Sequence, residues 1–182
     1  LIFDADILHY YAFYFMFGVF CIPLPNRSLV VLIGVINVVF LVMLFTLNYD
    51  AGWNWDDYTY SGFWTPVGFV RNLFFNGWHP VFPWLSFLLL GIALSRMPLH
   101  EERFQNRMIM WGLSVFVLTE VVSYILIASL AQGDAEMVAL LGTAPVPPMP
   151  LYIIAGMSIA VAMVGICLCT PEWFKSIGVL AF

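Results

Sequence analysis

His79 is the residue of this chain best suited to move a proton, and its surroundings are unlike those of an ordinary membrane helix. Where an apolar run begins, the chain places Trp78, Pro80, Pro83 and Trp84 around it. Proline suits a helix start, whereas histidine is costly in lipid and titrates near neutral pH. A histidine at a helix mouth could act as a general base toward a hydroxyl or amine. The alternative is a structural histidine bonded to neighbouring backbone.

A second titratable group precedes the first apolar run. Asp6 and His9 are three residues apart, so a helix would place them on one face, where the carboxylate could orient the imidazole. The alternative is that Asp4 and Asp6 cap the helix by accepting hydrogen bonds from its free N–H groups.

Glu120 is the acid placed deepest within an apolar run. An intramembrane carboxylate is costly and by default indicates a functional site. We expect it to be protonated, or paired with a histidine or with a hydroxyl such as that of Tyr124. Asn37, in another apolar run, is weaker evidence, because a lone amide often only bridges helices.

Three arginines, Arg96, Arg103 and Arg107, lie together between two apolar runs. Arg103 and Arg107 are four residues apart, and such a helix face could bind the phosphates of a soluble cofactor. The alternative is positive charge that sets topology beside anionic lipid. No metal site is expected, because Cys167 and Cys169 would point to different faces of a helix.

The elements that carry these residues belong to a membrane protein. The chain is 63% hydrophobic and 9% charged, whereas a soluble domain carries roughly 25% charged residues. A net charge of −5 with six basic residues gives no surface for nucleic acid. The runs are continuous rather than alternating, so the predicted fold is all-α, a polytopic membrane helix bundle in the lipid bilayer. Five transmembrane helices are predicted, near 7–24, 29–47, 78–94, 108–130 and 151–169, with an interfacial amphipathic helix over 64–75.

If successive helices cross the bilayer in opposite directions, each charged residue between them is assigned to one side of the membrane. Arg27, the 96–107 arginines and Lys175 fall on one side, which the positive-inside rule makes cytoplasmic. Arg71 is the one basic residue on the opposite side, together with His9 and His79. That side also receives most of the acids, namely Asp4, Asp6, Asp50, Asp56, Asp57, Asp134 and Glu136.

The loop over residues 48–65 interleaves aromatic rings with carboxylates. Such a pattern is typical of sugar-binding surfaces, although an interfacial aromatic belt with solvated acids would look the same. The chain begins without methionine and ends in an apolar run, so we expect residues 1–182 to be one membrane domain within a larger protein of ten or more helices. Its partners would then include those remaining helices; a homo-oligomer is compatible with the sequence.

The segment from Arg71 to Gly91 resembles one in bacterial multi-pass proteins grouped with the heparan-α-glucosaminide N-acetyltransferase family, in the transmembrane acyltransferase superfamily. The shared pattern is His-Pro-x-x-Pro-Trp at residues 79–84, an apolar helix, a glycine and a basic residue, here Gly91 and Arg96. The opening at residues 6–12 is similar to the family's Asp-Ile-Leu-x-x-Tyr-Ala helix start. In characterised relatives the proposed catalytic histidine belongs to an earlier segment, whereas His79 matches the later motif.

The resemblance implies transfer of an acetyl or other acyl group from cytoplasmic acetyl-CoA to an extracytoplasmic sugar or glycolipid, in the bacterial inner membrane. His79 or His9 would remove the acceptor's proton, Asp6 or Glu120 would orient the imidazole, and the 96–107 arginines would bind CoA. Two other functions are compatible with the residues. A transporter or flippase for a glycolipid or small polar substrate would use Glu120 and the proline-broken helix start, and a structural subunit would need neither.

Overall fold

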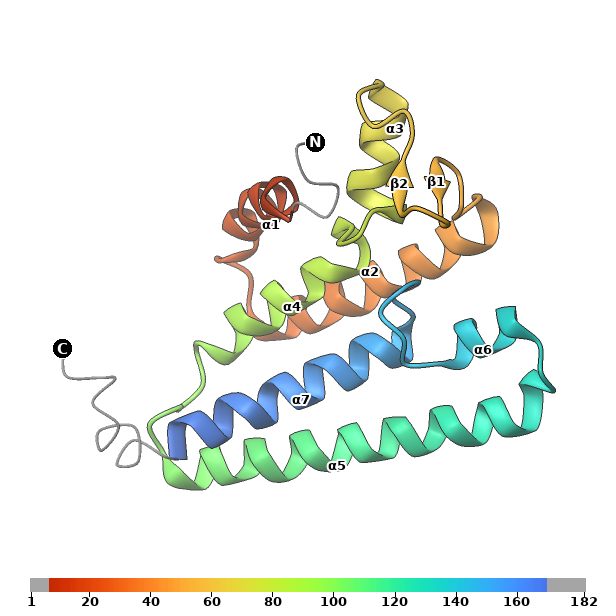
Figure 1. The fold of residues 1–182 in the computed structure, drawn as a ribbon. Coiled ribbons are helices and arrows are strands. Elements are labelled where there is room, and N and C mark those ends of the chain that lie inside the picture. Colours follow the sequence, from red (N-terminus) through yellow and green to blue (C-terminus); the bar gives the residue numbers. More distant parts are fainter. Residues whose placement is uncertain (1–6, 170–182) are drawn as a thin grey trace. The chain divides into compact units, whose positions relative to one another are not determined.

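The computed structural model describes residues 7–169, and their architecture is almost entirely helical (Figure 1). The predicted all-α fold is therefore confirmed. One two-stranded hairpin, of β1 (Trp53–Asn54) and β2 (Thr59–Tyr60), interrupts the helices. The helices are α1 (Leu8–Cys21), α2 (Asn26–Thr46), α3 (Pro66–Arg71), the π-helix η1 (Asn72–Asn76), α4 (Val81–Leu94), α5 (Glu102–Leu126), the π-helix η2 (Ile127–Ala131), α6 (Ala135–Leu141) and α7 (Pro150–Cys169).

These elements form two compact units. The first comprises residues 7–93 with the short segment 146–150, and it contains α1 to α4 and the hairpin. The second comprises residues 94–145 and 151–169, and it contains α5, α6 and α7. That both units act within a single membrane domain stays a prediction.

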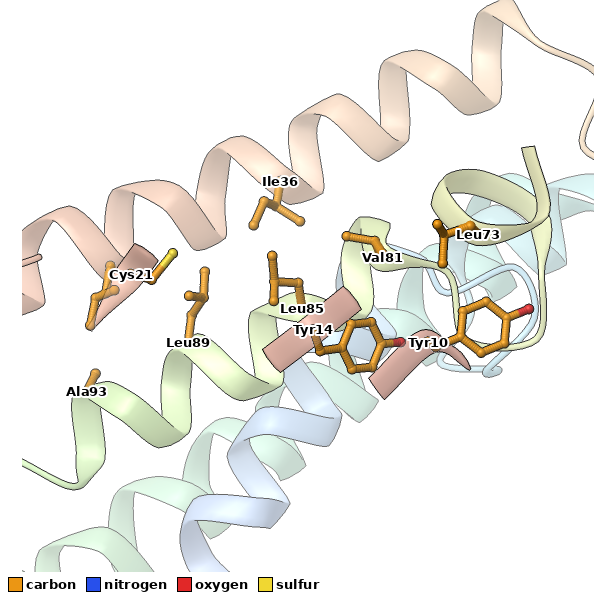
Figure 2. Close-up of a cluster of buried hydrophobic side chains, with 10 residues drawn as sticks. Tyr10, Tyr14, Cys21, Ile36, Leu73, Val81, Leu85, Leu89 and Ala93 are labelled. Atoms are coloured by element: carbon orange, nitrogen blue, oxygen red, sulfur yellow. The ribbon is translucent and has the colours of Figure 1, made fainter. Parts of the chain in front are cut away.

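In the first unit, α2 and α4 run antiparallel. The Asn26 side chain donates to the carbonyl of Ala93 at 3.3 Å, and Asn37 donates to Ser86 at 3.0 Å. Apolar side chains fill the space between the helices, and Figure 2 shows Ile36 facing toward α4. Asn37 thus bridges two helices, the modest role that the sequence left open for it.

The helix lengths agree with the predicted spans for α2 and α7 and differ for the first and third. The three helical stretches α2, α5 with η2, and α7 are each long and apolar enough to cross a membrane. By contrast, α1 has 14 residues and rises about 21 Å, less than the roughly 30 Å of a bilayer core. Its helix ends at Cys21, just before Pro23 and Pro25, because proline cannot continue the hydrogen-bond ladder.

The third predicted span, near 78–94, corresponds to α4, which has only 14 residues. The helical stretch α3–η1 and helix α4 pass the membrane test only as a pair, and they meet at a bend of 51°. The helix predicted to lie at the interface exists as α3 with η1. Thr65 begins it by accepting from the Gly68 N–H at 3.1 Å, and Pro66 occupies its first turn.

In the second unit, α5 and α7 approach closely where their residues are small (Figure 1). A Cβ built on Gly112 would lie 2.7 Å from the backbone oxygen of Ser158 and 2.8 Å from the backbone nitrogen of Ala162. Another on Gly165 would lie 3.0 Å from the Gln105 carbonyl oxygen. Small residues are what lets the backbones of membrane helices come together.

We therefore expect Gly112→Leu to destabilise the α5–α7 pair by about 1–3 kcal/mol, because the obstructing atoms belong to the backbone and cannot rotate away. The free energy of unfolding in detergent micelles would measure this. Gly91→Leu is the matched control, since nothing lies within 4 Å of a Cβ there. Equal losses in the two variants would contradict the packing argument.

Candidate functional site

Two tyrosines of α1 hold the turn that carries His79. Tyr10 and Tyr14 are four residues apart and point from one helix face, and both are buried. The Tyr10 hydroxyl donates to Asn72 Oδ1 at 2.6 Å and accepts from the Trp78 N–H at 3.2 Å. The Tyr14 hydroxyl donates to the backbone oxygen of His79. The turn between η1 and α4 is thereby fixed at two successive residues.

Gly77 lets this turn approach α1. Its φ of −74° is ordinary, so the requirement is space rather than backbone conformation. A Cβ there would collide with the Tyr10 hydroxyl and with the carbonyl oxygen of Asn72. The close approach of Tyr10 therefore explains why position 77 is a glycine.

The His79 side chain is partly buried against aromatic rings. Its ring centroid lies 4.8 Å from that of Trp84 and 6.0 Å from that of Tyr10, both in edge contacts. Its Nδ1 is buried and has no hydrogen-bond partner within residues 7–169. Tyr14 therefore fixes the backbone of His79, whereas the imidazole Nδ1 has no hydrogen-bond partner among the described residues.

His9 contacts Tyr10, the same tyrosine that His79 contacts. Its ring lies 3.8 Å from that of Tyr10 and 5.6 Å from that of Phe63. The structure thus brings both histidines against one tyrosine, which the sequence reasoning did not foresee. The predicted pairing of His9 with Asp6 falls on a residue outside the described part of the chain.

The aromatic loop predicted over residues 48–65 folds as a hairpin beside this turn. Trp53 and Trp55 stack with centroids 4.7 Å apart and an interplanar angle of 16°. Trp78 meets the edge of Trp53 at 5.0 Å and lies 6.0 Å from Tyr58. The aromatic surface therefore continues into the residue that precedes His79.

Asn76 connects the hairpin to the turn, and the sequence analysis missed it. Its side chain is fully buried. Its amide donates to the carbonyls of Tyr49 at 2.6 Å and Ala51 at 2.9 Å, and its oxygen accepts from Tyr60 at 3.0 Å. Its backbone oxygen also accepts from the Trp53 indole. One amide thus satisfies polar groups on both sides of the hairpin.

Glu120 lies in the second unit, on α5. Its carboxylate accepts a hydrogen bond from the Thr143 hydroxyl at 3.2 Å. A hydroxyl was among the predicted partners; it is that of Thr143 rather than that of Tyr124, which is 74% exposed. Thr143 comes from the connection that follows α6, a proximity that helix periodicity on α5 could not reveal.

The three arginines are all exposed and lie near the start of α5. Arg96 precedes that helix, whereas Arg103 and Arg107 share a face of its first turns. The helix begins at Glu102, six residues before the predicted start, so both arginines are helical as their spacing requires. Whether they bind a phosphate stays a prediction.

A comparison with known protein families shows which family the chain belongs to. The family model described as heparan-alpha-glucosaminide N-acetyltransferase, catalytic, matches residues 2–130, well over half of the chain. This chain belongs to the heparan-alpha-glucosaminide N-acetyltransferase family. The resemblance inferred from the motif at residues 79–84 is therefore confirmed.

Membership of the heparan-alpha-glucosaminide N-acetyltransferase family identifies the chain as part of a membrane acyltransferase family. The matched residues include the turn with His79, the hairpin, the arginines and Glu120, whereas Thr143 and α7 lie beyond them. No curated protein and no solved structure matches the chain.

Proposed function

We propose that this protein transfers an acyl group, in the simplest case acetyl, from cytoplasmic acyl-CoA to a sugar or glycolipid acceptor on the other side of the bacterial inner membrane. The observation that carries the proposal is the His79 turn. A histidine whose backbone is fixed by Tyr14, and whose buried Nδ1 has no partner among the described residues, fits a general base in a family of acyltransferases.

The proposed chemistry is a single acyl transfer. The His79 imidazole takes the proton from the acceptor's hydroxyl or amine as its oxygen or nitrogen attacks the thioester carbonyl. A new C–O or C–N bond forms, the C–S bond breaks, and the CoA thiolate receives the proton from the imidazolium. A carboxylate would orient the imidazole through Nδ1, as in a triad, and Asp6, outside the described residues, is the sequence's candidate for it. His9 is the alternative base, since it contacts the same tyrosine.

The hairpin supports a sugar acceptor. The stacked Trp53 and Trp55 present a flat apolar surface, and the Trp55 indole donates to Asp50 at 2.8 Å, which fixes the ring. The exposed carboxylates of Asp56 and Asp57 lie in the same loop and could accept hydrogen bonds from sugar hydroxyls. Trp78 links this surface to His79 in the chain.

The donor would be bound on the cytoplasmic side. Exposed guanidinium groups at Arg96, Arg103 and Arg107 suit the phosphates of CoA. The positive-inside rule supports this orientation, with Arg27 and Lys175 on the same side and the histidines opposite.

Membranes that contain the full-length protein test the proposal directly. Labelled acetyl-CoA would be added, and label would be followed into lipid and glycan fractions. Transfer above that of membranes lacking the protein supports acyl transfer. Transfer no greater than that background, with the protein shown to be folded and given lipid and glycan extracts as acceptors, would overturn it for the acetyl group.

If Trp55 stacks on the acceptor sugar, Trp55→Ala should raise the acceptor KM about two- to tenfold, the loss expected of one aromatic contact, and leave the acetyl-CoA KM unchanged. Initial-rate measurements at varied acceptor concentration would show this. Trp111→Ala is a matched control, because Trp111 is 62% exposed on α5, in the other unit. An unchanged acceptor KM in the Trp55 variant would remove the hairpin from the acceptor site.

The broken helix favours transport as a second candidate. A span interrupted by a 51° bend beside a histidine is a feature that transporters use to build midplane sites. Movement of a glycolipid across vesicle membranes without acetyl-CoA would support that function over acyl transfer.

A further inference from the structure

An apolar groove runs between the C-terminal end of α2 and the α3–η1 stretch. It is open to the surface, has a volume of about 540 Å³ and lies within the first unit. Its walls are aliphatic and aromatic, and one charged side chain, Arg71, borders it. The residues that define it are Met43, Leu47, Val67, Val70, Phe74 and Arg71.

Arg71 has no acidic partner among residues 7–169. Its Nε donates to the Tyr60 hydroxyl at 2.8 Å, and its guanidinium carbon lies 5.7 Å from the centroid of the Tyr60 ring. These neutral contacts orient the guanidinium and leave its charge uncompensated. A partly buried cation at the edge of an apolar groove favours an anion, and a phosphate can take two of its N–H groups.

If α2 spans the bilayer, the groove lies at the depth of lipid headgroups. The membrane-length helix α2 ends at Thr46, next to Leu47 of the groove, so this end of α2 is where the hydrocarbon core gives way to the interface. Trp64, just before α3, and Val67, in its first turn, are 81% and 74% exposed. Exposed aromatic and aliphatic side chains on a short helix at this depth are typical of contact with lipid.

We propose that this groove binds a membrane lipid, with one acyl chain against Val67, Val70 and Phe74 and with the headgroup phosphate on the Arg71 guanidinium. A neutral chain or an apolar helix would fill the groove but leave the arginine without an anion. A small soluble anion would match the arginine but leave the apolar walls unfilled. A lipid phosphate satisfies both. This proposal does not depend on the proposed acyl transfer.

The test uses the full-length protein in native membranes or lipid nanodiscs. The probes are a phosphatidylglycerol with a photoreactive diazirine in one acyl chain, and a diacylglycerol with the same chain and no phosphate. After irradiation, mass spectrometry of peptides would locate the label. We expect phosphatidylglycerol to label residues 64–75 at least about fivefold more than diacylglycerol does, because the phosphate–guanidinium contact adds to the apolar one.

Substitutions distinguish the loss of the Arg71 charge from a loss of the fold. Arg71→Gln should reduce phosphatidylglycerol labelling to the diacylglycerol level, and Arg71→Lys should retain most of it. Tyr60→Phe removes the same arginine–tyrosine bond and keeps the cation, so it should retain labelling. Arg27→Gln, at the opposite end of α2, is the matched control and should not change it. Equal labelling by the two probes, or no loss in Arg71→Gln, would overturn the proposal.

Discussion

Replacement of His79 by alanine is expected to lower acyl transfer by about 10²- to 10⁴-fold, the usual contribution of a general base. The fold should survive, because the hydrogen bond from Tyr14 reaches the backbone oxygen of His79, which alanine retains. Initial rates of label transfer from acetyl-CoA, compared at equal amounts of folded protein, would measure the loss.

His100→Ala is the matched control for that experiment. His100 is exposed and precedes α5 in the other unit, so its loss should change the rate by less than about twofold. If the His79 variant instead retains full activity, His79 is not the base. His9→Ala would then be the next variant, and activity retained there would exclude that histidine as the base too.

Asn76→Leu is expected to destabilise the protein by about 2–4 kcal/mol and to free the hairpin from the turn. Leucine has the same number and branching of side-chain heavy atoms as asparagine but none of its polar atoms. The carbonyls of Tyr49 and Ala51 and the Tyr60 hydroxyl would each lose a buried partner. Denaturant titration in detergent, followed by tryptophan fluorescence, would report both the stability and the loss of the Trp53–Trp78 contact.

The matched control for Asn76 is Asn54→Leu. Asn54 is exposed in β1, and its side chain accepts one hydrogen bond, from the Asp56 N–H at 3.2 Å. Its loss should cost less than about 0.5 kcal/mol. Similar losses at both positions would show that the Asn76 contacts do not hold the hairpin.

The sequence by itself determined where the long helices run. Helices α2 and α7 lie within three residues of their predicted bounds, because continuous apolar runs bounded by polar residues or proline leave few choices in a bilayer. The four-residue spacing of Arg103 and Arg107 likewise placed them on one helix face. Family membership followed from the motif around His79, since adjacent residues are read directly from the chain.

Only the tertiary structure decided what surrounds His79. Tyr10 and Tyr14 lie more than 60 residues away in the chain, and the bonds they make depend on α1 packing against the turn. The role of Asn76 and the pairing of Glu120 with Thr143 are equally non-local. Composition and periodicity report on neighbours within one helix, whereas contacts between helices depend on crossing angles and on close approach at residues such as Gly77, which no local pattern encodes.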